Sequence, residues 1–348
     1  MPKPGPHILV IRLSAMGDVA IAVLLLNSLV HQYRELKFTV LTKKPYVALF
    51  EAIPRVKVKI AEVETRHKSI SGLFQLSKEL YALQFTSVAD IHNVLRSKIL
   101  GTFLKLKGLQ IVKIDKGRAE KKALTRAKNK VFRPLKTTAT RYAEVFEALG
   151  YPVDFAHFKF LDKLTLDDDL KSALKWTSDK KPIGIAPFAA HEGKTYPEEL
   201  MKIVIAELSE KTNLQVYLFG GGQKESDTLA TWAKPYDNVI NIAGKFDFKT
   251  ELAIISNLDI MLSMDSGNGH LAAMYGVKVI SIWGQTHPYL GFAPYGQTED
   301  LQLIPDRKKF PFLPTSVYGN TKGIDNHSIL ASISPKLVVE KIKSQLSL

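Results

Sequence analysis

At 348 residues the chain exceeds the size of one ordinary core, which predicts two compact domains. Its 45% hydrophobic and 24% charged residues are typical of a soluble globular protein, and the absence of cysteine excludes disulfide scaffolds, thiolate nucleophiles and cysteine-bound metals. The chain is basic, with a net charge of +14, and no apolar run approaches the roughly 20 residues of a membrane helix, so no membrane span is expected.

The first half alternates short apolar runs with helix-length segments. Strands are expected at 7–13, 38–42, 56–60 and 86–91, and helices at 19–33, 45–52 and 73–83. Because neighbouring parallel strands need crossover connections, this alternation predicts a parallel sheet with helices on both faces.

A strongly basic stretch follows. Between Arg96 and Arg141 the chain carries 15 Lys or Arg and two acids, a net charge of +13. A solvated helical face is the ordinary explanation for such a run, but its one-sidedness favours an anionic partner. Nucleic acid, an anionic lipid surface and a phosphorylated substrate would each satisfy it.

The same alternation restarts after Pro182. Strands are expected at 183–187, 215–219, 259–264 and 277–283, and helices at 197–211, after Gly220–Gly222, at 271–275 and from Ser328 to the end. Residues 161–181 contain the linker. Asp167–Asp169 has the Asp-x-Asp spacing of some metal-dependent transferases, but acids also favour a helix start, and we predict no metal site.

In open α/β sheets, ligands bind at the carboxyl ends of the strands, so the loops there are the candidate sites. Ser14-Ala-Met-Gly-Asp18 follows the first strand, and it lacks the Gly-x-Gly-x-x-Gly dinucleotide fingerprint. On position alone Asp18 is typical of a helix cap. The functional alternative is a general base that takes a proton from an acceptor hydroxyl.

Two further loops suit phosphate chemistry. Asp265-Ser-Gly-Asn-Gly-His270 opens a helix, whose free N–H groups and positive dipole end favour a pyrophosphate. A purely structural glycine turn is the alternative. Lys194 lies in the loop after the strand at 183–187, where its charge would stabilise a departing diphosphate, although a surface lysine is equally ordinary there.

Together these loops resemble glycosyltransferase family 9, the ADP-heptose:lipopolysaccharide heptosyltransferases. The resemblance covers nearly the whole chain, and it rests on the segments 8–19, Lys194-Thr-Tyr-Pro197, 265–273 and 283–286, with support from 115–118 and 316–320. It implies an α/β fold of the GT-B type, with two Rossmann-like domains facing across a cleft. We therefore expect an acceptor domain at 1–165, a nucleotide-sugar domain at 166–325, and a C-terminal helix at 326–348 that packs back on the N-terminal domain.

The resemblance also implies the chemistry. It predicts an inverting, metal-independent enzyme without a cofactor that moves heptose from ADP-heptose to the inner core of lipopolysaccharide. The carried-over roles are catalytic for Asp18 and Lys194, donor-binding for Asp265, Ser266, Gly267, Asn268 and His270, and acceptor-binding for Arg118, Lys121 and Lys122. The basic stretch would then meet an anionic lipopolysaccharide precursor, with the enzyme cytoplasmic and peripheral on the inner membrane.

The chain departs from the family pattern in two places. Phe312 and Thr315 lie where some relatives carry cysteines, and Phe188-Ala-Ala190 lacks the hydroxyl groups that other members place near the donor phosphate. A family member that transfers another sugar, or uses another nucleotide, in envelope glycan synthesis is therefore the principal alternative. A binding-only homologue and a nucleic-acid-binding protein are the others, but Asp18 is present and no nucleic-acid-binding motif is recognised, so no nucleic acid is expected.

Overall fold

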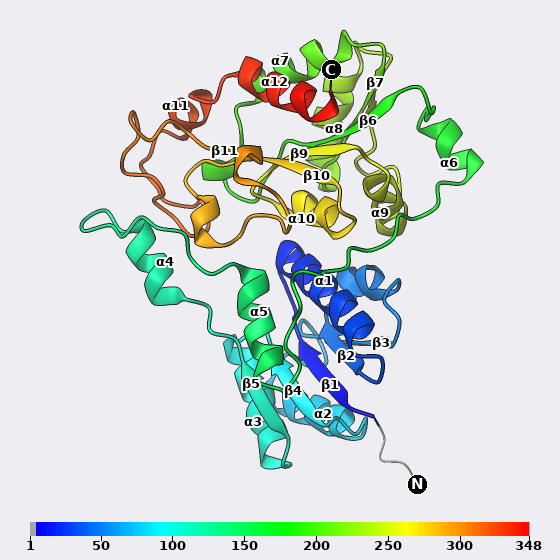
Figure 1. The fold of residues 1–348 in the computed structure, drawn as a ribbon, viewed down its shortest axis with the longest axis vertical. Helices are drawn as coiled ribbons and strands as arrows, with labels where there is room; N and C mark the ends of the chain where they lie inside the picture. The colour runs from blue at the N-terminus through cyan, green and yellow to red at the C-terminus, as the bar shows by residue number, and fades with distance from the viewer. Residues whose placement is uncertain (1–4, 348) are drawn as a thin grey trace. The chain divides into compact units, whose positions relative to one another are not determined.

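Two separate parallel sheets organise the chain in the computed structural model, which describes residues 5–347 (Figure 1). The first sheet has the order β3-β2-β1-β4-β5. Its strands are β1 (His7–Ile11), β2 (Lys37–Thr42), β3 (Val56–Ile60), β4 (Ser87–Asp90) and β5 (Gln110–Lys113). The central strand β1 pairs in parallel with β2 and β4, and residues 8–11 are buried, which explains why this strand is a continuous apolar run.

Helices cover this first sheet. They are α1 (Met16–Gln32), α2 (Ile70–Tyr81), α3 (Leu95–Leu106) and α5 (Thr138–Glu147), with a 3₁₀ helix η1 at Lys44–Phe50. Every residue of α1 from Val19 to Val30 is buried, because this helix is apolar nearly all round. The expected elements of the first half are thus present, with boundaries shifted by a few residues.

The second sheet has the order β11-β10-β9-β6-β7-β8, which is the doubly wound order 3-2-1-4-5-6 when counted from β6. Its strands, all parallel to their neighbours, are β6 (Lys181–Ala186), β7 (Leu214–Leu218), β8 (Val239–Asn241), β9 (Ile260–Met264), β10 (Lys278–Ile282) and β11 (Gln302–Leu303).

The helices of the second unit are α4 (Arg118–Thr125), α6 (Asp168–Ala173), α7 (Glu198–Ser209), α8 (Gly222–Ala233), α9 (Phe248–Ser256), α10 (Gly267–Met274), α11 (Asn326–Ala331) and α12 (Pro335–Leu346). Short 3₁₀ helices lie at Glu192–Lys194, Pro288–Leu290 and Glu299–Leu301. Asp167 caps α6 by accepting a hydrogen bond of 2.8 Å from the Leu170 N–H, so it marks a helix start.

The compact units differ from the domains that we predicted. The first contains the chain up to Lys116 together with Thr138–Leu161, and the second contains Gly117–Thr137 and the chain from Asp162 onward. The segment Gly117–Thr137 was expected in the N-terminal domain. It belongs to the second unit because it packs there, and its Leu135 N–H donates to the carbonyl of Tyr289 at 2.9 Å.

The C-terminal helix α12 contributes to the core of the second unit. The buried side chains of α12, among them Val338, Val339 and Ile342, lie in the core of the second unit, and α12 contacts α7. They are apolar at helical spacing and complete that core. Among residues 5–347 no helix combines the length and hydrophobicity needed to cross a membrane. Residues 1–4 and 348 of the predicted domains lie outside the described part.

Candidate active site

Asp18 lies where the first strand gives way to the first helix. Ala15 is the N-terminal cap of α1 and Asp18 falls within the first helical turn, so the helix-cap interpretation of Asp18 is wrong. Its carboxylate forms an ion pair with the Arg12 guanidinium. The Asp18 side chain keeps 32% of its surface exposed, whereas that of Arg12 keeps 6%. The arrangement therefore presents a carboxylate to solvent on a buried cationic support.

Arg12 is itself held in place by backbone and aromatic contacts. Its Nη1 donates to the carbonyl of Ile91 at 2.8 Å, and its guanidinium carbon lies 5.7 Å from the centre of the buried Tyr142 ring. The Tyr142 hydroxyl donates to the backbone carbonyl of Asp18 at 3.4 Å. These contacts tie β1, β4, α1 and α5 together around one carboxylate.

The end of β4 adds a buried acid, Asp90, and the loop after β4 adds a buried histidine, His92. Burial lowers the pKa of His92 to about 3, with further lowering by the charges of Arg12, Lys116, Arg96 and Lys43. Asp90 accepts hydrogen bonds from the N–H groups of His92 and Asn93 at 3.1 and 2.7 Å. The second carboxylate oxygen of Asp90 is buried and has no hydrogen bond among the described residues. This end of the sheet is therefore rich in positive charge.

Arg12, Asp90 and His92 were absent from the sequence prediction. A signal for them existed, because β4 follows the same alternation and pairs with β1, so its carboxyl end opens at the same edge as Asp18. The sequence did not show which strand of the five would lie beside β1.

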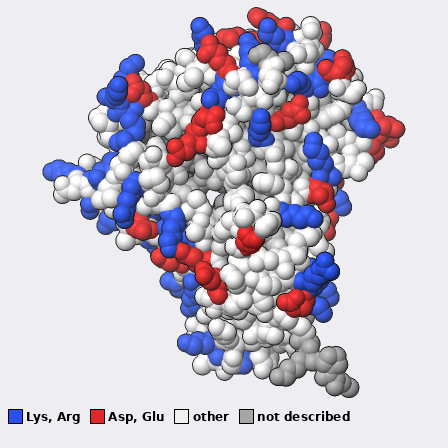
Figure 2. Space-filling view, viewed as in Figure 1, with Lys and Arg blue, Asp and Glu red and all other residues white. Residues whose placement is uncertain are grey.

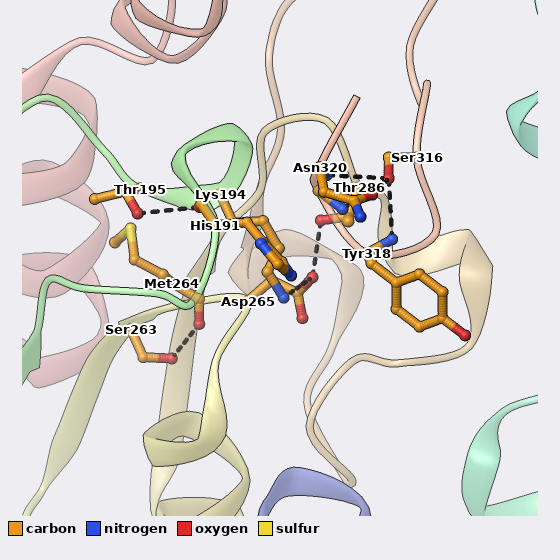
Figure 3. A network of polar contacts seen from close by, with 11 residues as sticks. His191, Lys194, Thr195, Ser263, Met264, Asp265, Thr286, Ser316, Tyr318 and Asn320 are labelled. Carbon is orange, nitrogen blue, oxygen red and sulfur yellow. Dashed lines mark hydrogen bonds and ion pairs between the residues drawn. The ribbon is translucent and has the colours of Figure 1, made fainter. Parts of the chain in front are cut away.

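In the second unit, three side chains converge before α10. The Lys194 ammonium lies 3.3 Å from the Asp265 carboxylate, and the Thr286 hydroxyl donates to the same oxygen at 2.8 Å (Figure 3). Only 16% of the Lys194 side chain and 10% of the Asp265 side chain are exposed. Asp265 therefore braces the lysine beside the helix start.

The N-terminus of α10 is built to accept an anion. Ser266 is its N-terminal cap with extended backbone, and the Ser266 Oγ is buried without a hydrogen bond among the described residues. The first N–H groups of a helix have no partner within the helix, and its dipole adds positive potential. Gly269 is required by packing, because a Cβ there would lie 2.5 Å from the Ser263 hydroxyl. His270 is buried in the same turn.

A loop from the C-terminal part of the chain fixes Lys194 from the other side. Ser316 Oγ accepts hydrogen bonds from the N–H groups of Tyr318, Gly319 and Asn320 at 2.9–3.2 Å. Gly319 has a φ of +79°, and a Cβ there would lie 2.3 Å from Lys194 Cγ. The loop thus closes directly onto the lysine stem, and only glycine permits this approach.

Gln285 joins that loop to the rest of the site. Its N–H donates to the carbonyl of Gly193 at 2.7 Å, and its side chain bonds both the N–H and the carbonyl of Thr321 at 2.8 Å. Next to it lies a cavity of about 420 Å³, lined by residues 190–193, 319–324 and 326. Gln285 and Thr286 appear in the sequence motif, but no role was predicted for them.

Comparison with known proteins decides the family. The family described as glycosyltransferase family 9 (heptosyltransferase) matches residues 73–311, more than half of the chain. The chain belongs to glycosyltransferase family 9. The lipopolysaccharide core heptosyltransferase OpsX of Haemophilus influenzae is 25% identical over 303 residues, which cover 85% of this chain and 83% of that protein.

Solved structures agree on the fold. The family 9 glycosyltransferase of Veillonella parvula has a TM-score of 0.75 at 19% identity and covers 100% of this chain and 99% of its own. The E. coli heptosyltransferase WaaC, solved with ADP, has a TM-score of 0.68 at 17% identity, with 97% and 99% covered. The predicted α/β fold of the GT-B type is confirmed, and this family 9 member is a glycosyltransferase.

The three cations predicted to bind the acceptor lie on α4, in the second unit. Arg118 and Lys122 are exposed, whereas Lys121 is 9% exposed, and its ammonium lies 4.0 Å from the centre of the Phe292 ring. Basic side chains gather over α4 and its surroundings in the space-filling view (Figure 2). The exposed pair remains suited to an anion, while Lys121 anchors α4 by a cation–π contact.

Proposed function

We propose that this family 9 enzyme transfers a heptose from ADP-heptose to a sugar of the lipopolysaccharide inner core, with inversion and without a metal. The observation that carries the proposal is the Lys194–Asp265 pair, 3.3 Å apart, at the N-terminus of α10. It combines a fixed cation with free backbone N–H groups, which is the environment that a leaving diphosphate requires. The names of OpsX and of the E. coli enzyme support heptose and ADP.

In the proposed mechanism, the donor diphosphate binds at the start of α10. Ser266, Gly267 and Asn268 offer the cap hydroxyl and the first N–H groups of the helix, and His270 lies one turn further on. Lys194 compensates the charge that grows on the diphosphate as the bond between its oxygen and the anomeric carbon breaks. The diphosphate leaves without protonation, so no general acid is needed on this side.

Asp18 acts on the acceptor. Its carboxylate takes the proton from an acceptor hydroxyl while that oxygen forms its bond to the anomeric carbon, opposite the departing diphosphate. Arg12 contacts the Oδ2 atom, which leaves Oδ1 for the proton. His92, on which the charge of Arg12 also acts, is only 8% exposed.

The positive charge around Asp18 supports an anionic acceptor. Arg12, Lys43, Arg96 and Lys116 all act on His92, so a phosphorylated or acidic sugar chain would be attracted to the same place. Arg118, Lys121 and Lys122 are the further acceptor candidates, of which the first and last are exposed.

The donor assignment is tested by mass spectrometry. The purified enzyme, given a heptose-free lipopolysaccharide precursor, should convert ADP-heptose to ADP while the acceptor gains the mass of one heptose. Other ADP-sugars and UDP- and GDP-sugars serve as competitors. Faster transfer from one of these would replace heptose with that sugar, and hydrolysis without acceptor modification would contradict the transfer.

We also propose that the enzyme is a cytoplasmic protein that associates peripherally with an anionic membrane, where its acceptor would lie. Arg118, Lys122, Arg126 and Lys128 are exposed on and after α4, and each cation near such a surface contributes about 1 kcal/mol. Replacing all four by Gln should reduce sedimentation with phosphatidylglycerol vesicles, while phosphatidylcholine vesicles serve as the control. Unchanged sedimentation with anionic vesicles would contradict this association.

A further inference from the structure

A cavity of about 660 Å³ in the second unit has no part in the proposed reaction. It lies between the segment after α4 and the loop after β10, which run side by side (Figure 1). We call it the His287 pocket. It is lined by Phe132, Pro134, Leu135, Thr137, His287, Pro288, Tyr289, Ala293, Gln297, Glu299, Gln302, Ile304, Pro305, Asp306 and Arg307.

One aromatic ring organises the wall of the His287 pocket. The Phe132 ring has the His287 ring at 5.1 Å, edge to face, and the Tyr289 ring at 5.0 Å, tilted by 36°. The Arg307 guanidinium carbon lies 3.4 Å from the Phe132 ring centre. A cation and a histidine are therefore both fixed against one ring before any ligand binds.

Two buried N–H groups in this wall have no hydrogen-bond partner within residues 5–347. His287 is 4% exposed, and its Nδ1 accepts a hydrogen bond of 3.1 Å from the Tyr289 N–H. Burial, together with Arg307 and Lys130, lowers the His287 pKa to about 4, so the ring is neutral at pH 7 and carries its proton on Nε2. That Nε2 and the Nε of Arg307 are buried without a hydrogen bond among the described residues.

The basic and acidic side chains around the pocket lie on different parts of its lining. Arg307 has no carboxylate within ion-pair distance in the described part of the chain, and burial lowers the pKa of nearby Lys130 to about 8. The acids of the lining are Glu299 and Asp306, and the exposed Asp306 accepts a hydrogen bond of 2.8 Å from the Lys308 N–H. The positive charge therefore lies against the inner aromatic wall, beside the unpartnered donors.

Buried donors without partners cost free energy, which an acceptor in the pocket would recover. We propose that the His287 pocket binds a carboxylate or phosphate that carries a planar apolar group. The oxyanion accepts hydrogen bonds from His287 Nε2 and Arg307 Nε. The apolar group lies against Tyr289, Ile304 and Pro305. This site goes beyond the proposed transfer reaction and uses none of its assigned residues.

Isothermal titration calorimetry with phenyl phosphate and with benzoate tests this site. Both titrations are made with the full chain saturated with ADP, so that the start of α10 is already occupied. At least one compound should bind with a stoichiometry of one, and inorganic phosphate and benzyl alcohol, each carrying half of the recognised chemistry, should bind at least tenfold more weakly. Failure of both compounds to bind the ADP-saturated chain would overturn the proposal.

Two substitutions assign the binding to the pocket. His287→Asn removes the Nε2 donor, but an Asn Oδ1 can still accept from the Tyr289 N–H. Arg307→Met removes the charge and the Nε donor while retaining contact with Phe132. Each should weaken phenyl phosphate or benzoate at least tenfold and leave ADP affinity unchanged, which also verifies folding of the second unit. Undiminished affinity in both variants would place the ligand elsewhere and refute the inference.

Discussion

Asp18 and Asp265 are both aspartates at the start of a helix and both pair with a cation, yet their surroundings differ. Asp18 lies inside the first turn of α1, has Arg12 as its partner and keeps 32% of its side chain exposed. Asp265 precedes the cap of α10, holds Lys194 and Thr286, and keeps 10% exposed. An exposed carboxylate can take a proton from a substrate, whereas an enclosed one whose Oδ2 atom contacts both Lys194 and Thr286 serves to orient those two side chains.

The largest expected effect separates these two roles. Asp18→Asn should lower kcat by about 10³-fold, which is within the range for loss of a general base. The amide cannot take the proton from the hydroxyl of the acceptor sugar, whereas ADP affinity should be unchanged. Steady-state rates and ADP titrations measure both. Asp168→Asn is the matched control, since Asp168 is also a first-turn aspartate in an ion pair, with Lys171. Near-normal turnover in Asp18→Asn would remove this residue from the mechanism.

Lys194→Met should follow with a loss of about 10²-fold in kcat and weaker ADP-heptose binding, because the charge opposite the diphosphate is lost. Lys202→Met is a suitable control, since Lys202 lies on α7 of the same unit over the Trp232 ring. If donor affinity and rate survive in Lys194→Met, then Asp265 holds a merely structural lysine and the contrast with Asp18 disappears.

A smaller effect is expected from the glycine that packs on this lysine. Gly319→Ala should reduce kcat about tenfold by displacing the Lys194 stem, which lies 2.3 Å from the position of the added Cβ. Gly323 has a similar φ of +72° but nothing within 4 Å, so Gly323→Ala reproduces the backbone strain without the collision. Equal losses in the two variants would assign the effect to strain.

The smallest effect concerns the pH dependence of stability and the buried His92, on which the charge of Arg12 acts. His92 is neutral when folded because its pKa is lowered to about 3, whereas in the unfolded chain it gains a proton below about 6.5. Its contribution to stability is therefore complete above pH 6.5 and falls as the pH drops towards 3, by up to about 1.4 kcal/mol per pH unit. His92→Gln should reduce the loss of melting temperature between pH 7.5 and 5. An identical loss in both proteins would show that His92 is not buried in its neutral form.

Much of the fold followed from local patterns. Apolar strand runs such as 7–13 and the helical segments between them predict parallel sheets, and the loops after β1 and β9 predict Asp18 and the Asp265 turn. The partners of these residues could not be predicted, because they depend on contacts between distant segments. Arg12 and Tyr142 meet only after α5 folds onto α1, and Gly319 reaches Lys194 only through a loop more than a hundred residues away.

The prediction of the domain boundary was wrong for a related reason. The residues after α4 contain no long periodic pattern, so nothing local marked Phe132 and Leu135 as part of the second unit. These two residues pack in the second unit because they contact Tyr289, which lies far along the sequence.

Gly117–Thr137 belongs to the second unit, although the chain before and after it belongs to the first. The polypeptide therefore passes between the two units three times rather than once. No single cut can therefore release either unit intact. A fragment that begins at Asp162 would lack α4 and Phe132 and would expose apolar surface around Tyr289 and Phe292. During synthesis, this piece of the second unit emerges before the rest of that unit exists, so its packing must wait until the loop after β10 has been made.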